Sequence, residues 1–411
     1  MDGIKKVELL APAGNHEKFE YAVAYGADAV YLGGSSFSMR AAADNFSLDE
    51  IRSAVSLAHS NGKKVYVALN ITARGSQIPE MTGYALKLHE AGVDAFIISD
   101  TGVMRAVKRE IPNARIHVST QANVTNHEAA IFYYEQGASR IVLARELSLD
   151  EISVIRSKIP KELELEVFVH GAMCISYSGR CLLSSFMTGR DGNQGDCAQS
   201  CRWKYALVEE KRPGGYYPVF EDSNGSYILN SKDLCLIGYI DSLIGAGVDS
   251  FKIEGRMKSI FYTSTVVKIY REAIDTYYND PLSYTTDEAW LRELDTVSHR
   301  EYTTGFINGV PTDSVNPSSS SYIRGYTFTG VVKEHDEENM MLLVEQRNNF
   351  KTGEELELVS PGKKPEKYYV GQIFDADLNA IAAAPHPQMK VYLPYNGEKV
   401  SPYSFFRRRS K

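Results

Sequence analysis

Four of the five cysteines of this 411-residue chain lie close together, at Cys174, Cys181, Cys197 and Cys201. Four thiolates are the ligand set that an iron–sulfur cluster requires. Zinc also binds four thiolates, but its ligands usually come in closely spaced C-x2–4-C pairs, and six residues separate Cys174 from Cys181. Cysteines that are scattered and merely buried are the remaining alternative. The clustering favours an iron–sulfur centre.

The composition supports a metal or redox use of these thiols. Five cysteines are an odd number in a long chain that shows no export signal, and disulfides are uncommon in that setting. No segment approaches the roughly 18 consecutive apolar residues that a membrane span requires. We therefore expect a cytoplasmic protein without membrane attachment. The net charge of −7 argues against a generally basic nucleic-acid-binding protein but still allows a local RNA-binding groove.

The elements that position the cysteines follow one recurring pattern, in which an amphipathic helix ends at a glycine and a short apolar strand follows. Such repeated units predict an α/β protein with a parallel sheet, and eight strands predict a closed TIM barrel. The expected strands lie within residues 7–14, 24–34, 64–71, 90–102, 115–122, 135–146, 163–171 and 245–256. A doubly wound open sheet is the alternative, which is weaker because no glycine-rich phosphate fingerprint follows the first strand.

Changes in composition divide the chain. We predict a barrel domain over residues 1–280, a loop-rich linker over 281–324 and a small β-barrel module over 325–411. The cysteine-containing insertion at 171–230 is too long for an ordinary βα loop. Because it follows a strand, it belongs on the face where barrels keep their active sites.

Three further expectations concern the second half of the chain. A helix is expected within 231–247, with Cys235 on its apolar side as a core residue, and a long helix at about 258–278. The basic tail at 405–411 is either a solvated end or an RNA contact.

Strand alternation predicts an unusually polar barrel interior. On the strand at 163–170 the inner face would carry Glu166, Phe168 and His170, and on the strand at 250–256 it would carry Lys252 and Glu254. Buried charges are costly unless they are paired, so this interior indicates either an active site or a structural ion-pair network of Glu166, Glu254 and Lys252. As an active site, it offers His170, Glu166 and Glu254 as catalytic candidates.

The C-terminal ends of the strands supply candidates for substrate binding, since barrel active sites form there. These are Asn70, Gln121, Arg145 and Arg256. Guanidinium groups grip carboxylates through two hydrogen bonds, so the two arginines suit a carboxylate-bearing substrate. His170 lies four residues before Cys174 and is expected beside the cluster.

The segment EVFVHGAMCISYSGRCLLS at 166–184 resembles the signature of the collagenase-like peptidase family. ELLAPAG at 8–14, YLGG at 31–34 and FKIEGRMKS at 251–259 are also similar to that family. The resemblance extends from the N-terminus to about residue 280. The C-terminal module resembles the β-barrel of the tRNA-hydroxylation branch.

This resemblance implies a 4Fe–4S cluster on the four cysteines and oxygen-independent hydroxylation. Relatives act on tRNA wobble uridine, on ribosomal RNA cytidine or on ubiquinone precursors. The branch suggested by the C-terminal module converts wobble uridine to 5-hydroxyuridine and depends on prephenate, whose two carboxylates suit Arg145 and Arg256. It implies tRNA and prephenate as ligands and leaves open a partner or paralogous protein.

Two other activities have less support in the residues. A peptidase is implied by the family name, but the sequence holds neither an HExxH zinc motif nor a GxSxG nucleophile elbow. Metal ligation would also consume the thiolates that a cysteine peptidase needs. A Schiff-base aldolase using Lys252 would leave the four cysteines unexplained.

Overall fold

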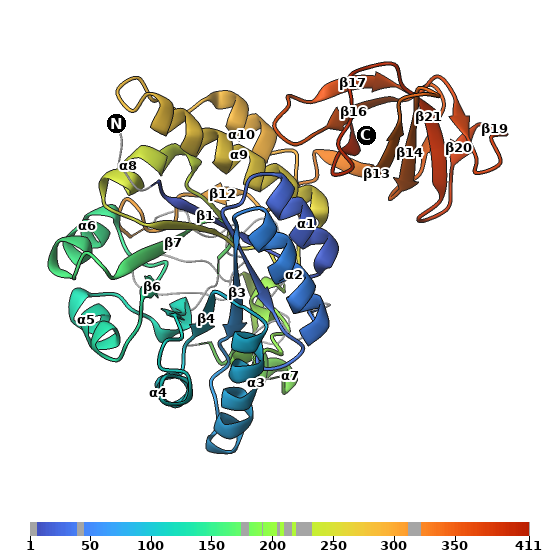
Figure 1. Ribbon diagram of the computed structural model, residues 1–411. Coiled ribbons are helices and arrows are strands. Elements are labelled where there is room, and N and C mark those ends of the chain that lie inside the picture. The colour runs from blue at the N-terminus through green and yellow to red at the C-terminus, as the bar shows by residue number, and fades with distance from the viewer. Residues whose placement is uncertain are drawn as a thin grey trace.

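The computed structural model describes residues 6–38, 45–173, 181–190, 192–203, 206–208, 216–218, 232–310 and 322–410. A closed barrel of eight parallel strands forms the larger part (Figure 1). Its strands are β1 (Glu8–Pro12), β2 (Ala29–Gly33), β3 (Lys64–Leu69), β4 (Ala95–Ile98), β5 (Ile116–Val118), β6 (Arg140–Val142), β7 (Glu164–Ala172) and β11 (Ser250–Ile253). β11 pairs with both β7 and β1, which closes the barrel. The predicted TIM barrel is therefore confirmed, and the open sheet is excluded.

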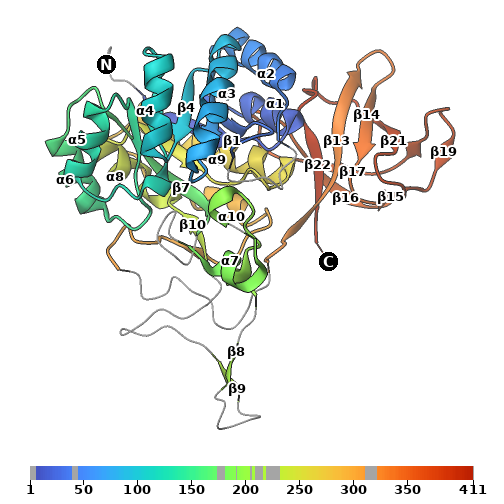
Figure 2. The same ribbon diagram turned by 90° about the horizontal axis from the view of Figure 1, so that it is seen from below.

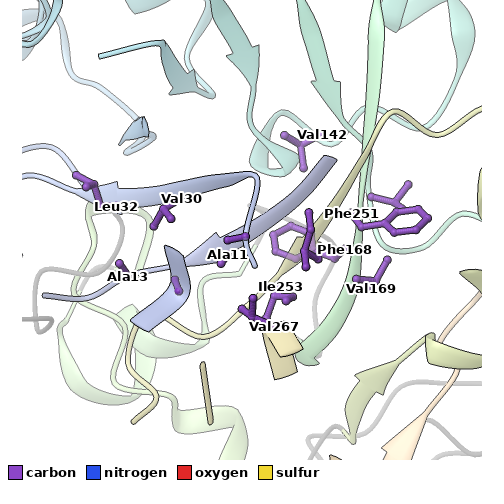
Figure 3. Packing of buried hydrophobic residues seen from close by; sticks show 14 of the residues in the cluster. Ala11, Ala13, Val30, Leu32, Val142, Phe168, Val169, Phe251, Ile253 and Val267 are labelled. Carbon is purple, nitrogen blue, oxygen red and sulfur yellow. The ribbon is translucent and has the colours of Figure 1, made fainter. Parts of the chain in front are cut away.

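Helices surround the barrel and cover the apolar outer faces of its strands (Figure 1). They are α1 (His16–Ala24), α2 (Leu48–Ser60), α3 (Ile78–Glu90), α4 (Thr101–Glu110), α5 (His127–Glu135), α6 (Leu149–Lys158), α8 (Ile240–Gly245) and α9 (Ile260–Asn279). Ser47 and Ser148 begin α2 and α6 with capping boxes, which satisfy the first free N–H groups of those helices. Val267 of α9 belongs to the same core as Val169 and Ile253 on the strands (Figure 3).

The segment expected to be one helix at 231–247 contains a strand instead. β10 (Asp233–Cys235) runs antiparallel to β7 and is followed by a 3₁₀ turn, η5 (Ile237–Tyr239), and then by α8. The prediction was wrong because the N-terminal part of the segment pairs with β7, a strand far away in sequence, and tertiary pairing overrides local helical pattern. Cys235 is buried, as expected, and the long helix α9 is confirmed.

Regular elements also occur in the segment expected to be a loop-rich linker. α10 (Glu288–Leu294) packs on α9, and β12 (Tyr302–Thr303) pairs with β10. The cysteine insertion contributes α7 (Leu183–Thr188), the 3₁₀ turns η3 (Gly192–Gln194) and η4 (Ser200–Arg202), and the hairpin β8 (Ala206–Val208) and β9 (Tyr216–Pro218). These elements lie together beyond one end of the barrel (Figure 2).

The C-terminal region forms an antiparallel half-barrel with its own hydrophobic core beside the TIM barrel (Figure 1). Its strands are β13 (Tyr326–Asp336), β14 (Met341–Gln346), β15 (Phe350–Lys351), β16 (Glu355–Val359), β17 (Glu366–Tyr369), β18 (Ile373–Phe374), β19 (Ala380–Ile381), β20 (Ala383–Ala384), β21 (Lys390–Pro394) and β22 (Phe405–Arg409). The main sheet has the order β17-β16-β22-β13-β14-β21-β18-β19.

The basic tail is part of this sheet. β22 lies between β13 and β16, and Arg407 is only 2% exposed. Its guanidinium binds Glu293 of α10 and Glu357 of β16. The expectation of a solvated end is wrong, because pairing on both sides makes β22 an internal strand, and Arg407 is not available to RNA. No helix among the described residues is long and apolar enough to cross a membrane.

Candidate functional site

An ion-pair network fills the N-terminal end of the barrel. The Arg140 guanidinium, 2% exposed, lies 2.6 Å from a carboxylate oxygen of Glu8 and 2.9 Å from one of Glu166. It also binds Glu164, while Lys252 lies 2.7 Å from the other oxygen of Glu166. Glu166 and Lys252 therefore form an ion pair, as expected if the polar interior is a structural network. This network lies at the N-terminal end of the barrel strands.

Burial and this network shift the pKa values of the groups in it. Burial by itself would raise the pKa of Glu8, but the Arg140 charge and hydrogen bond together hold it below its usual value. His117, which is buried against the Tyr66 ring, has a pKa well below the usual value because of burial and the Arg140 charge. The sequence analysis did not identify Arg140 and Glu8 as members of this network. Each is the first residue of a strand, and strand alternation could have assigned both to the inner face.

The opposite, C-terminal end of the barrel carries polar groups that are partly exposed. The Asn70 Nδ2 donates to Gln121 Oε1 over 2.6 Å, and the Ser119 hydroxyl donates to the same oxygen over 3.3 Å. Gln121 lies on the 3₁₀ turn η2 (Thr120–Ala122), which Thr120 fastens to the next strand by donating to the Leu143 carbonyl. The structure thus brings together two of the four predicted substrate-binding residues.

Arg145 lies three residues after the end of β6, which pairs with β5, the strand that precedes Gln121. Its guanidinium stacks 4.1 Å from the centre of the Phe168 ring and donates to the Ala172 carbonyl over 2.8 Å. Among the described residues no carboxylate lies within ion-pair distance of it, in contrast to Arg140. Arg145 is therefore a half-buried cation held against the backbone of Ala172, two residues before Cys174 in the sequence.

Arg256 lies on a different side of the barrel mouth. It is 4% exposed and donates to Ser38 and Asn45, both over 2.6 Å, in the connection that follows β2. A cavity of about 280 Å³ adjoins these partners, and its lining residues are Gly34, Ser35, Ser36, Phe37, Ser38, Asn45, Ile71, Gln77, Glu80 and Gln194. Arg145 is not among the residues that line this cavity.

His170 does not face the barrel interior. The register of β7 against β11 shifts between Phe168 and His170, so that His170 pairs with the outward-facing Ile253. Its ring packs against Tyr270 and Tyr302 outside the barrel. The predicted inner position was wrong because this β-bulge reverses the alternation. Burial lowers the pKa of His170 to about 3, so the ring is neutral near pH 7, and its catalytic role stays a prediction.

Glu254 and Glu166, the two other predicted catalytic residues, lie in different surroundings. Glu254 accepts a hydrogen bond from the Tyr31 hydroxyl over 3.2 Å. Tyr31 belongs to the apolar cluster inside the barrel, so Glu254 lies at the interior near the mouth, whereas Glu166 is completely buried in the network below. The structure does not bring the three predicted catalytic residues together.

The cysteine insertion contacts the mouth through η3. Asn193 accepts a hydrogen bond from the Thr72 backbone over 3.0 Å, and Gln194 bonds both Thr72 and Gln77. Figure 2 shows α7 on this side of the barrel. These hydrogen bonds hold the segment that carries Cys181, Cys197 and Cys201 against the residues that follow β3.

Inside the insertion, Ser184 of α7 joins the elements around the cysteines. Its hydroxyl accepts a hydrogen bond from the Ala198 backbone over 2.9 Å, and Asn193 donates to the Cys181 carbonyl over 3.2 Å. The Cys197 sulfur, on an exposed residue, accepts the Gln199 backbone N–H over 3.4 Å.

The donor set fits an iron–sulfur centre, because accessible thiols and N–H groups directed at sulfur are what such centres use. Cys174 lies outside the described residues, and within them no group of three or more His, Cys, Asp or Glu side chains is arranged to hold a metal ion. Ligation by the four cysteines stays a prediction.

Comparison with known proteins places the chain in a family. Peptidase family U32 matches residues 14–317, and the peptidase family U32 C-terminal domain matches residues 324–407. The "tRNA hydroxylation protein P1" of Bacillus subtilis (strain 168) is 40% identical over 98% of this chain and 95% of its own length. The "tRNA hydroxylation protein P" of Escherichia coli (strain K12) is 35% identical over 95% of this chain and 94% of its own.

A third relative is the "23S rRNA 5-hydroxycytidine C2501 synthase" of Escherichia coli (strain K12), which is 36% identical over 74% of this chain and 45% of its own length. The two matches together cover the barrel from α1 onward, the cysteine insertion and the half-barrel as far as Arg407. This chain therefore belongs to peptidase family U32.

Proposed function

We propose that this protein is an iron–sulfur enzyme for the oxygen-independent, prephenate-dependent hydroxylation of tRNA wobble uridine to 5-hydroxyuridine. The observation that carries the proposal is the full-length similarity to proteins named for tRNA hydroxylation, at 40% and 35% identity. The geometry is consistent with it, because the cysteine segment is held at the mouth of the barrel beside polar groups suited to a small substrate.

In this proposal Cys174, Cys181, Cys197 and Cys201 hold a 4Fe–4S cluster, which supplies electron transfer when it is bound. Arg145 holds a carboxylate of prephenate, because its guanidinium is fixed by Phe168 and Ala172 without an acidic partner in the described chain. Arg256 is a second cation for the same co-substrate, acting from the β2 side. Asn70 and Gln121 contact the nucleobase, and Glu254 supplies a carboxylate inside the barrel near its mouth.

The peptidase named by the family is the second candidate. The sequence lacks the zinc and serine motifs described above, and Cys235 is buried with its pKa raised to about 11 by burial, which suppresses its thiolate. We propose hydroxylation in preference, with tRNA and prephenate as ligands and a partner or paralogous protein as a further requirement to be tested.

Nucleoside analysis of tRNA tests the proposal. A strain that lacks this gene and any paralogue should lose 5-hydroxyuridine and the nucleosides made from it, and the wild-type gene should restore them. Serine at Cys174, Cys181, Cys197 or Cys201 should abolish restoration, whereas the matched control Cys235→Ala should retain it, since Cys235 is a core residue of β10. Unchanged tRNA nucleosides in the deletion strain, or loss of 5-hydroxycytidine from ribosomal RNA instead, would refute the substrate.

A separate measurement tests the cluster. Protein purified without oxygen should contain iron and acid-labile sulfide in a ratio near one, with visible absorption that each of the four serine substitutions removes. Stoichiometric zinc without iron would contradict the cluster, whatever the tRNA result. Prephenate dependence is tested by feeding prephenate to a strain that cannot make it, which should restore the modification.

A further inference from the structure

We infer that the Gln121 amide reads the pyrimidine edge and makes the site select uracil over cytosine. This inference rests on the proposed function, because it assigns the selectivity of that same site. It starts from the hydrogen bonds that fix which end of the amide faces the mouth.

Two donors hold the Gln121 carbonyl oxygen. Asn70 Nδ2 lies 2.6 Å from Oε1, and the Ser119 hydroxyl lies 3.3 Å from it. Both neighbours donate in the structure, so the carbonyl end of the amide faces them and the NH₂ end faces away. The orientation of Gln121 is therefore set by its surroundings before any ligand arrives.

The NH₂ group of Gln121 is available to a ligand. It makes no hydrogen bond within the described part of the chain and is not sealed from solvent, as Gln121 is only partly buried. The turn that carries it is held by a hydrogen bond to the next strand segment. Thr120 ties it to Leu143, and Asn123, at its end, adopts a left-handed backbone with φ of 56°. A fixed donor is thus presented at the C-terminal end of the barrel.

The chemistry of the two pyrimidines decides what such a donor selects. Uracil has a carbonyl oxygen at carbon 4, which accepts a hydrogen bond, whereas cytosine has an amino group there, which only donates. An amide NH₂ facing that edge binds uracil and meets a second donor in cytosine. A site that leaves a donor unpaired discriminates more strongly than one that loses an apolar contact.

Two substitutions reverse the donor by independent routes. In Gln121→Glu the carboxylate still accepts from Asn70 and Ser119 but offers the mouth only an acceptor. In Asn70→Asp the neighbour becomes an acceptor, so the Gln121 amide turns its NH₂ inward and its carbonyl toward the mouth. Both variants should favour the amino group of cytosine. The matched control is Gln136→Glu, on an exposed residue after α5, which should change nothing.

The test uses a reporter tRNA expressed in two forms, with uridine or cytidine at the wobble position, in the complemented deletion strain. Mass spectrometry of the isolated tRNA measures hydroxylation of each form. We expect wild type and Gln136→Glu to hydroxylate the uridine form, and Gln121→Glu and Asn70→Asp to lower that level about tenfold. Both should raise the share of hydroxylated cytidine.

The outcomes separate the two proposals. Wild-type protein that hydroxylates neither form overturns the proposed function. Two other outcomes overturn the role of Gln121 alone, when the wild-type protein hydroxylates the uridine form. In one, both variants keep the wild-type level of hydroxylated uridine; in the other, they lose hydroxylation of both forms with an unchanged ratio. Thermal unfolding of the purified variants within a few degrees of wild type shows that a changed ratio reports recognition and not misfolding.

Discussion

Arg140 illustrates at the scale of single residues how this barrel tolerates charges inside it. Its buried guanidinium forms ion pairs with Glu8, Glu164 and Glu166. Lys252 binds the remaining oxygen of Glu166. Removing one partner from such a group leaves charges that are buried and uncompensated, which costs more than the pair contributes. The network is therefore a support of the barrel, located at the end opposite the mouth.

We predict that Arg140→Met lowers the free energy of unfolding by about 3–5 kcal/mol at pH 7, because three carboxylates lose their common cation. Urea unfolding measures this, and Arg109→Met, at an exposed position, is the control, with a change of less than about 0.5 kcal/mol. An equal effect of both variants would contradict the network's structural role.

The pH dependence of the same variant follows from Glu8. Its pKa in the folded protein lies below the ordinary value of 4.5, so it stabilises the fold above that pH, and this contribution is lost as the pH falls through the folded pKa. In Arg140→Met this acid-induced part should shrink, because the pKa of Glu8 is no longer held down. Unfolding free energies measured from pH 7 to pH 3 should show a shallower acid slope in the variant.

At the scale of elements, β7 connects the interior to the cysteine segment. Its bulge turns His170 outward, and Gly171, one residue before its end, takes a positive φ of 111°. A Cβ at Gly171 would lie 2.5 Å from the carbonyl oxygen of Glu254, the residue after β11, so the two backbones pass too close there for a side chain at Gly171.

Gly171→Ala should therefore lower the free energy of unfolding by roughly 2–4 kcal/mol, from backbone strain and the contact with Glu254 together. Gly189→Ala is the matched control, because Gly189 also has a positive φ, of 70°, but nothing within 4 Å of the added Cβ. It should cost only about 1–2 kcal/mol. Calorimetry compares the two, and indistinguishable melting temperatures would count against the close approach.

At the scale of the whole molecule, the two domains are joined by buried contacts. Phe261 of α9 stacks on Phe328 of β13 at 6.0 Å between ring centres, and Phe405 packs against both. Arg407 reaches from β22 to Glu293 of α10 at 2.6 Å. An apolar stack with a buried ion pair beside it indicates that the half-barrel keeps one orientation relative to the barrel.

We predict that Arg407→Met weakens this joint, because Glu293 and Glu357 lose their shared cation. We expect one thermal transition for the wild type and two for this variant, with the half-barrel unfolding first. Arg409→Met, on the same strand but exposed, should keep one transition. Differential scanning calorimetry shows the number of transitions. One transition in both variants would mean that the aromatic stack alone couples the domains.

The sequence by itself determined the barrel and, for much of it, which strand residues face inward. Helix caps, glycines after helices and apolar runs are local signals, so all eight strands were predicted where they occur. Alternation placed Lys252 inward and Phe251 outward, because β11 is regular at those positions. The clustering of the cysteines and their place after β7 are likewise properties of the chain order.

Only the tertiary structure decided the rest. His170 changed face because a bulge depends on the register between β7 and β11, which local alternation does not encode. Arg140 binds a carboxylate on a strand far away in the chain. Arg407 is buried because its strand pairs with neighbouring strands on both sides. The partners of a charged or hydrogen-bonding side chain are the groups that the fold brings next to it. Packing across the whole molecule determines these partners, and neighbours in sequence do not.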